Sequence, residues 1–112
     1  MKIAVTALQN SLDSDIDPRF GRAKYLVIYN TVTDQYTILD NTRNKDLAHG
    51  AGTQTVQDVV QHDVRYIITG DCGPKAERAL QAAKVDIIRG VNGTVEKAVH
   101  AFKAGTLTAA TQ

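Results

Sequence analysis

The chain has 112 residues, of which 13 are basic and 12 acidic, so its formal net charge is +1. This length suits one domain with a sizeable core, and the charge balance argues against a general nucleic-acid or anionic-membrane partner. No apolar run of about 18 residues occurs, and the first apolar stretch is too short for a signal peptide, so we expect a cytoplasmic protein. The single cysteine, Cys72, excludes an internal disulfide and a cluster held by four thiolates of one chain.

The first part of the chain predicts strands. Three stretches rich in β-branched and aromatic residues indicate them: residues 2–8, 24–30 and 35–39. Residues 31–34 form a tight turn, so the second and third strands make an antiparallel hairpin. Residues 40–52 are rich in Asn, Lys, Asp and Gly. They predict a loop that is longer than most connections in compact domains.

The rest of the chain alternates helices with strands. Short apolar runs predict strands over residues 65–69 and 85–88. The first of three predicted helices has Thr53 near its start, the second spans residues 74–83, and the third is capped by Thr94. Apolar residues at helical spacing mark the faces that we expect to be buried: Val56, Val59 and Val60 in the first helix, Ala76, Ala79, Leu80 and Ala83 in the second, and Val95, Ala98, Val99 and Phe102 in the third.

The order β-β-β-α-β-α-β-α predicts a single α/β domain over residues 1–105. Right-handed crossovers give a mixed five-stranded sheet with helices on its faces, in which only the second strand is antiparallel to the others. Residues 106–112 are polar and small, and we expect a flexible tail there. The strand order suits a ribonuclease-H-like sheet. A nuclease of that type needs a metal-binding carboxylate on the first strand, and residues 2–8 contain none.

Four loops are expected at one edge of this sheet: the loop after the first strand, the long loop at 40–52, and the turns at 70–74 and 89–93. Open α/β sheets bind ligands at that edge, beyond the carboxyl ends of the parallel strands. Three helix N-termini also point there, each with free backbone N–H groups and a partial positive charge. Basic side chains accompany them: Arg19, Arg22, His49, Lys75 and Arg89. The arrangement predicts a site for a compact, polyanionic ligand.

Cys72 and His49 each have a functional and a structural interpretation. Cys72 precedes a predicted helix, whose dipole would lower the pKa of the thiol and favour the thiolate as a ligand for a soft metal or a metal–sulfide cluster. The alternative is a small buried residue that fills a tight turn. His49 would be a ligand, a donor to an anion, or a surface histidine. A Cys/His nucleophile lacks a recognisable oxyanion arrangement, which argues against hydrolysis.

A calcium loop is also excluded. Asp13, Asp15 and Asp17 alternate as at the start of such a loop, but the sixth position is Pro18 instead of glycine. The twelfth position is Lys24 instead of the bidentate glutamate that the motif requires. These carboxylates are better interpreted as a solvated acidic loop.

Two motifs resemble those of the dinitrogenase iron–molybdenum cofactor biosynthesis family. The first is the run from Ser11 to Ala23 with the strand that follows it, and the second is Gly70-Asp71-Cys72-Gly73-Pro74-Lys75-Ala76. The resemblance covers almost the whole chain in length and element order. It implies a ribonuclease-H-like fold without the nuclease site, and a protein that binds or carries nitrogenase metal–sulfur cofactors or their precursors. Small relatives of the orange-protein type hold a molybdenum–copper sulfide cluster non-covalently.

The family's motifs carry over at individual positions. Arg19, Phe20 and Gly21 match a loop that in cofactor carriers often reads His-Phe-Gly, so here an arginine stands where that version supplies a histidine. Ala23 stands where many relatives have a cysteine. These departures favour a cluster held by charge, N–H groups and shape. The predicted cofactor-binding residues are Arg19, Phe20, Gly21, Arg22, His49, Gly50, Gly52, Cys72, Gly73, Pro74 and Lys75, with Cys72 and His49 as the metal contacts.

The sequence therefore predicts a non-catalytic protein that binds, carries or scaffolds an anionic metal–sulfide cluster. The cluster is expected to contain molybdenum with iron or copper, as an iron–molybdenum cofactor precursor or a molybdenum–copper sulfide, held without covalent bonds. Other cofactor-assembly proteins are the expected partners, with no nucleic acid or membrane among them. The alternative is a metal-free regulatory or interaction module that binds a small anion or a protein partner at the same edge.

Overall fold

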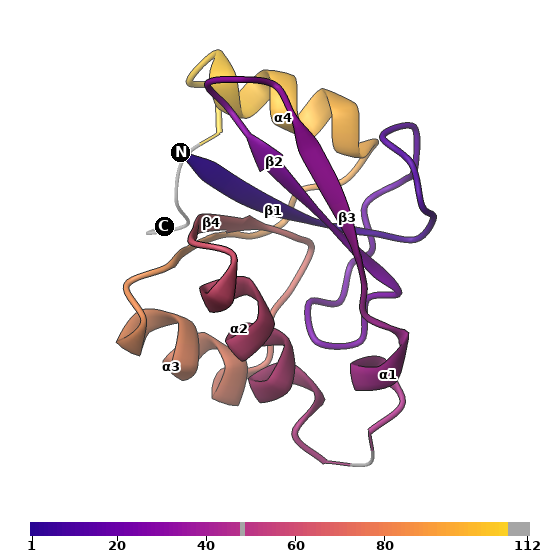
Figure 1. The fold of residues 1–112 in the computed structure, drawn as a ribbon, viewed down its shortest axis with the longest axis vertical. Coiled ribbons are helices and arrows are strands. Elements are labelled where there is room, and N and C mark those ends of the chain that lie inside the picture. Colours follow the sequence, from indigo (N-terminus) through magenta and orange to yellow (C-terminus); the bar gives the residue numbers. More distant parts are fainter. Residues whose placement is uncertain (48, 108–112) are drawn as a thin grey trace.

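The structure, a computed structural model, describes residues 1–47 and 49–107. Its centre is a five-stranded sheet with the strand order β3-β2-β1-β4-β5 (Figure 1). The strands are β1 Lys2–Ala7, β2 Tyr25–Asn30, β3 Tyr36–Asp40, β4 Val64–Ile68 and β5 Asp86–Ile88. The helices are α1 Thr42–Lys45, α2 Ala51–Gln61, α3 Pro74–Ala82 and α4 Val95–Lys103. No helix in these described ranges is long and apolar enough to cross a membrane.

The sheet is mixed, as the sequence predicted. β2 runs antiparallel to both β1 and β3, while β1, β4 and β5 pair in parallel. Parallel neighbours require a crossover, and α2 and α3 supply the two crossovers, from β3 to β4 and from β4 to β5. The mixed five-stranded α/β architecture is thereby confirmed, and the ribonuclease-H-like label stays a prediction.

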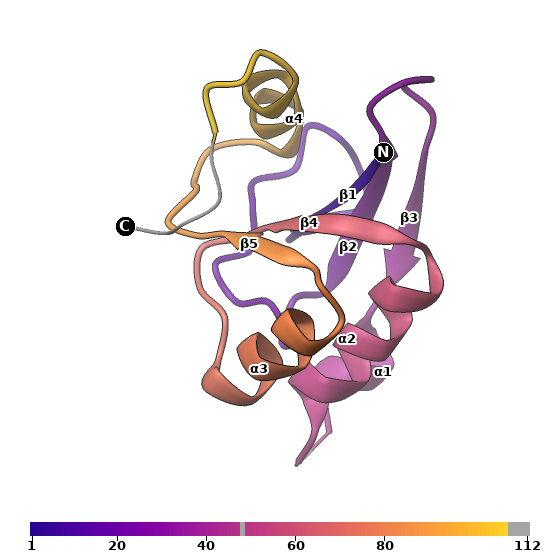
Figure 2. The same cartoon turned by 90° about the vertical axis from the view of Figure 1, so that its left-hand side faces the viewer.

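Helices cover both faces of the sheet, with α2 and α3 on one side and α4 on the other (Figure 2). Side chains alternate along each strand, so every strand contributes to two separate cores. The core under α2 and α3 includes Phe20, Leu26, Val59, Ile67 and Leu80. The core under α4 includes Ile3, Val5, Val27, Val95 and Val99.

Three local expectations were wrong. The predicted loop at 40–52 contains the short helix α1, and α2 begins at Ala51, after Gly50 in the left-handed conformation with φ 80°. Val60 is 41% exposed, because the buried face of α2 is formed by Val56 and Val59 together with two smaller residues. Ala83 is also exposed, since α3 ends before it.

The first two residues of the predicted flexible tail, Thr106 and Leu107, contact the rest of the domain. Thr106 donates from both its N–H and its hydroxyl to the Ala101 carbonyl, at 2.9 Å in each case. Leu107 packs against the core under α4. Residues 108–112, the remainder of the predicted tail, lie outside the described residues.

Candidate functional site

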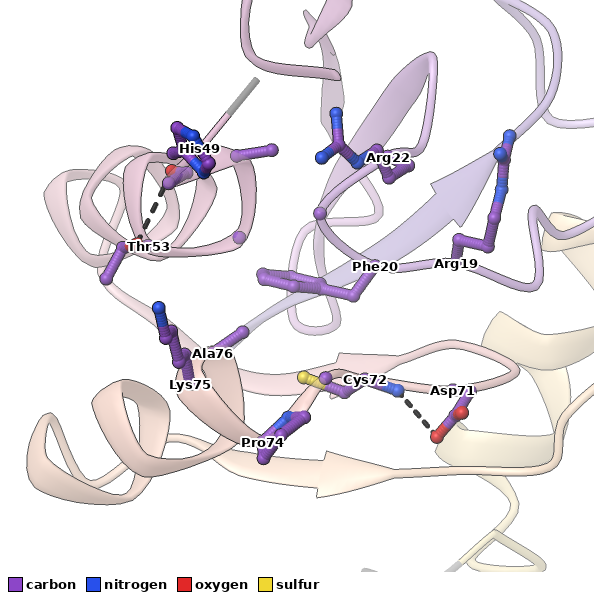
Figure 3. A pocket seen from close by; sticks show the side chains of 15 residues that line it. Arg19, Phe20, Arg22, His49, Thr53, Asp71, Cys72, Pro74, Lys75 and Ala76 are labelled. Carbon is purple, nitrogen blue, oxygen red and sulfur yellow. Dashed lines mark hydrogen bonds between the residues drawn. The ribbon is translucent and has the colours of Figure 1, made fainter. Parts of the chain in front are cut away.

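A cavity of about 480 Å³ opens where three chain segments meet (Figure 3). The segments are the loop 19–22, the start of α2 at 49–53 and the start of α3 at 71–76. All eleven predicted cofactor-binding residues line it: Arg19, Phe20, Gly21, Arg22, His49, Gly50, Gly52, Cys72, Gly73, Pro74 and Lys75. The structure therefore brings them together, while their roles stay predictions.

Backbone hydrogen bonds attach the loop 19–22 to the turn before α3. The Asp71 N–H donates to the Pro18 carbonyl at 2.7 Å, and the Phe20 N–H donates to the Asp71 carbonyl at 3.1 Å. Gly70 allows this contact, because a Cβ there would lie 2.7 Å from the Pro18 Cα. The loop is thus fixed beside the carboxyl end of β4.

Close packing also fixes the loop against α2. A Cβ on Gly21 would lie 2.6 Å from the Gly52 Cα, and a Cβ on Gly52 would lie 3.0 Å from the Ala76 Cβ. The approach of the loop to α2 therefore requires Gly21, and a side chain at Gly52 would need Ala76 to shift slightly. Gly73 is different, since an added Cβ there would meet no described atom within 4 Å. Its φ of −66° is also open to any residue, so Gly73 lines the cavity without being required by close packing.

Two helices begin at the cavity, and neither has a side-chain cap. Gly50 and Gly73 stand at the N-cap positions of α2 and α3, and no side-chain hydrogen bond caps either helix within the described residues. Pro74 has no N–H, so the first donors of α3 are the N–H groups of Lys75 and Ala76. The positive ends of two helix dipoles therefore meet at one cavity.

The third helix start lies elsewhere, contrary to expectation. The Thr94 hydroxyl caps α4 by accepting from the Lys97 N–H at 3.2 Å, and the Val95 N–H donates to the Ser14 carbonyl at 2.9 Å. The turn at 89–93 is not among the segments lining the cavity. Arg89 instead pairs with Glu77 at 2.9 Å. The local difference between these helix starts is the N-cap residue, which is Thr94 in α4 and a glycine in α2 and α3.

The basic side chains at the cavity are less available than expected. The Asp17 carboxylate accepts from the Arg19 N–H at 2.9 Å and lies 3.5 Å from its Nε, and Figure 3 shows the Arg19 side chain directed away from Cys72. Arg22 donates through one terminal nitrogen to the carbonyls of Lys45 and Leu47, at 2.6 and 2.7 Å. Arg22 therefore connects the loop 19–22 to the end of α1 and the segment just after it. Lys75, in contrast, is exposed and extends toward α2 (Figure 3).

Cys72 is a buried thiol in the wall of the cavity, below Phe20 in Figure 3. Burial raises the pKa of the Cys72 thiol to about 11, although the charge of Arg89 acts in the opposite direction. The expected lowering of this pKa at a helix start was wrong, because desolvation outweighs the nearby positive charge. The thiol is protonated at neutral pH, which also argues against a cysteine nucleophile.

Metal ligands do not gather in the part of the chain that the structure describes. Over residues 1–47 and 49–107, no three or more His, Cys, Asp and Glu residues are arranged to hold a metal ion. His49 and Cys72 line the same cavity, but from its α2 and α3 sides respectively.

Sequence reasoning missed four lining residues: Ala51, Thr53, Asp71 and Ala76. Asp71 is the most informative of them, because its carboxylate accepts from the Cys72 N–H at 2.8 Å and holds the turn before α3. Its position next to Cys72 in the second motif was the available signal. A carboxylate in a predominantly basic cavity also limits how much negative charge the site can hold.

The chain belongs to the dinitrogenase iron–molybdenum cofactor family, whose sequence profile matches residues 1–105. It is similar to the apo form of the orange protein from Desulfovibrio gigas, with 38% identity, coverage of 98% of this chain and 92% of that one, and a TM-score of 0.94. A putative NifB protein from Thermotoga is 35% identical, with 99% and 94% coverage and a TM-score of 0.86. An uncharacterised protein of Methanocaldococcus jannaschii is 28% identical over 110 residues, 96% of this chain and 89% of that protein. The family predicted from the two motifs is confirmed.

Proposed function

We propose that the cavity binds an anionic metal–sulfide cluster, and that the protein carries or scaffolds this cluster in the cytoplasm without catalysing a reaction on it. The observation that carries the proposal is the meeting of two uncapped helix starts, α2 and α3, at one cavity of about 480 Å³. Backbone N–H groups at helix starts bind compact anions. Membership of the cofactor family gives this anion its chemical class.

The cluster would be held by contacts around it instead of by metal–protein bonds. The described residues contain no group of three or more His, Cys, Asp and Glu side chains arranged to hold a metal ion. Sulfide ligands of the cluster can instead accept hydrogen bonds from the N–H groups of Lys75 and Ala76, while the Lys75 ammonium balances charge. The open space beside Gly73 would receive the cluster, and the buried ring of Phe20 would exclude water from it.

The metals are proposed to be molybdenum with iron or copper. The family description names an iron–molybdenum cofactor, and the similar structure from Desulfovibrio gigas is that of an orange protein. Cys72 and His49 are proposed to contact such a cluster from the cavity wall, Cys72 as an S–H donor and His49 through its imidazole. Proteins of cofactor assembly would be the donors or acceptors of the cluster.

A second candidate is a metal-free module that binds a small anion or an acidic segment of a partner at the same cavity. The observation that favours it is the donor set itself: N–H groups and cationic side chains surround the cavity, and the described residues offer no metal-ligand group. This candidate predicts salt-sensitive binding of a colourless anion.

The deciding experiment is purification without oxygen from the native host, followed by analysis for molybdenum, iron, copper and labile sulfide and a visible spectrum. A coloured protein with near-stoichiometric metal and sulfide would support the carrier, and the element ratio would identify the cluster. A colourless protein that also takes up no tetrathiomolybdate, with or without Cu(I), would favour the metal-free module.

A matched pair of variants tests the role of charge at the cavity. Lys75→Gln removes a cation at the cavity, whereas Arg78→Gln removes one from the same helix outside the lining. Tetrathiomolybdate binding should weaken roughly tenfold in Lys75→Gln, the effect of about one charge-assisted hydrogen bond. Arg78→Gln should bind tetrathiomolybdate as the wild type does. An equal loss of affinity in both variants would mean that only the net charge of the protein matters, and not the position of Lys75.

A further inference from the structure

Asn41 is a buried polar residue immediately after β3 and outside the lining of the cavity. Its side chain is 1% exposed and makes four hydrogen bonds. The Asn41 Nδ2 donates to the carbonyls of Ala23 and Gly21, at 2.8 and 3.4 Å. Its Oδ1 accepts from the Asn44 Nδ2 at 2.9 Å and from the Thr55 hydroxyl at 3.1 Å.

These four contacts join three separate segments of the chain. Gly21 belongs to the loop that lines the cavity, and Thr55 belongs to α2, whose first turn lines the cavity opposite that loop. Asn44 lies in α1, and the carbonyls at and just after the end of α1 accept from Arg22. Asn41 is therefore bonded to two walls of the cavity and to the segment that fastens the loop.

We propose that Asn41 is a positioning residue for cluster binding, which sets the distance between the loop 19–23 and the start of α2. The proposal rests on the proposed function of the cavity. Asn41 does not touch the cluster itself. It acts through the Gly21–Gly52 contact, which leaves no room for the loop to move closer to α2.

The chemistry of this position demands an amide. Two carbonyl oxygens on one side require a donor, and the Asn44 amide on the other side donates to an acceptor. The Thr55 hydroxyl shares its one proton between the Asn41 Oδ1 at 3.1 Å and the Ala51 carbonyl at 2.8 Å. A carboxylate would supply the acceptor but would face the carbonyls of Gly21 and Ala23 without a proton to donate. An apolar side chain would leave these two carbonyls without this donor and would remove the link between α1 and α2. A site whose walls are less rigidly positioned binds its ligand more weakly, even when every residue that contacts the ligand is retained.

The test compares Asn41→Asp and Asn41→Ala with Val99→Ala. Val99 is 1% exposed in the core under α4, on the opposite face of the sheet, so its truncation lowers stability without touching the cavity. The affinity for tetrathiomolybdate, measured from the visible spectrum of the bound anion, should fall by about tenfold or more in both Asn41 variants. This is the loss typical of residues that orient the binding residues without touching the ligand. Val99→Ala should bind as the wild type does.

Asn41→Asp keeps the volume of the side chain and guards against a variant that fails to fold. Hydrogen exchange on the unloaded proteins gives a second measurement that does not depend on the cluster. The amides of Phe20 and Ala23, which donate to the carbonyls of Asp71 and Phe20, should exchange faster in Asn41→Asp than in the wild type. Val99→Ala should not increase their exchange rates relative to those of the core amides.

The outcomes separate the two proposals. Wild-type protein that does not bind tetrathiomolybdate would overturn the proposed function, and the exchange measurement would then decide alone whether Asn41 positions the loop. Wild-type binding with unchanged affinity in both Asn41 variants, or with the same loss in Val99→Ala, would overturn the role of Asn41.

Discussion

Single residues in the cavity wall acquire their chemistry from burial. The Cys72 thiol is 6% exposed, and its pKa is raised to about 11 because a thiolate would lose hydration there. A ligand in the cavity would therefore meet Cys72 as a neutral, soft group at neutral pH. A cluster that already has its own sulfide ligands is compatible with such a group.

The protonation of Cys72 predicts a steep pH dependence of its alkylation. Only the thiolate reacts, and a raised pKa means that the thiolate fraction grows about tenfold for each pH unit from about pH 7 to about pH 10. Mass spectrometry of the iodoacetamide product over this range would measure the rate. A rate that levels off near pH 8 would contradict the buried, protonated thiol.

Replacing Gly73 with serine should weaken binding without lowering the stability of the fold. A side chain at this position would meet no described atom within 4 Å, and serine is a good N-cap residue, so Gly73→Ser should leave the free energy of unfolding unchanged or raise it by a few tenths of a kcal/mol. The same side chain would occupy the proposed cluster position and accept from the first N–H groups of α3. Tetrathiomolybdate binding should therefore weaken strongly while urea unfolding is unaffected.

Gly21 provides the contrasting variant. Because a Cβ at Gly21 would lie 2.6 Å from the backbone of Gly52, Gly21→Ala must push the loop away from α2. The free energy of unfolding should fall by about 1–3 kcal/mol, the cost of overpacking a fitted contact. Urea unfolding that matches the wild type would show that the loop and α2 are less closely fitted than described.

At the scale of elements, three helices differ in the residue at the N-cap. Glycines stand at the N-cap positions of α2 and α3, whose first N–H groups have no side-chain cap at the cavity, whereas the N-cap of α4 is a threonine whose hydroxyl accepts from the Lys97 N–H. A capped helix start lacks the free donors that attract an anion. The composition of the N-cap therefore separates the structural helix from the two at the candidate site.

Thr94→Ala tests this difference between helices. Loss of the cap should reduce the free energy of unfolding by about 1 kcal/mol, which urea denaturation would measure. Binding of tetrathiomolybdate should not change, because the start of α4 is bonded to the loop around Ser14 and does not line the cavity. Reduced affinity in this variant would contradict the placement of the site.

At the scale of the whole molecule, binding at this cavity joins segments from both halves of the chain. The loop 19–22 follows β1, while the turn at 71–73 follows β4, the parallel neighbour of β1 in the sheet. A ligand that contacts both segments binds the folded state and not the unfolded chain. Occupancy of the cavity is therefore coupled to global stability.

This coupling predicts a thermal shift. Tetrathiomolybdate at about one hundred times its dissociation constant should stabilise the fold by about 2.7 kcal/mol and raise Tm by roughly 10 °C for a domain of this size. Circular dichroism with and without the anion, and with sulfate as a control anion, would measure the shift. An equal shift with sulfate would favour the metal-free module, and an unchanged Tm would contradict binding at the cavity.

The sequence by itself determined the five strands, the three longer helices, the family and eleven of the residues that line the candidate site. Strand and helix periodicities are local, and the carboxyl ends of parallel strands meet at one edge, so the order of elements alone groups residues 19–22, 49–52 and 72–75. Val60 was wrongly predicted to be buried, because neighbouring elements decide which part of an apolar helix face is covered. The helix α1 was missed, because neighbouring elements also decide whether a polar loop forms a helical turn.

Only the tertiary structure decided how those residues behave. The raised pKa of Cys72 results from burial under distant residues such as Phe20. The engagement of Arg22 depends on carbonyls more than twenty residues away, with sequence separations of 23 and 25. Asn41 sits in a stretch that resembles an ordinary polar loop, and three of its four partners, Gly21, Ala23 and Thr55, are brought to it only by the fold. Desolvation and non-local hydrogen bonds depend on three-dimensional neighbours, which local patterns do not encode.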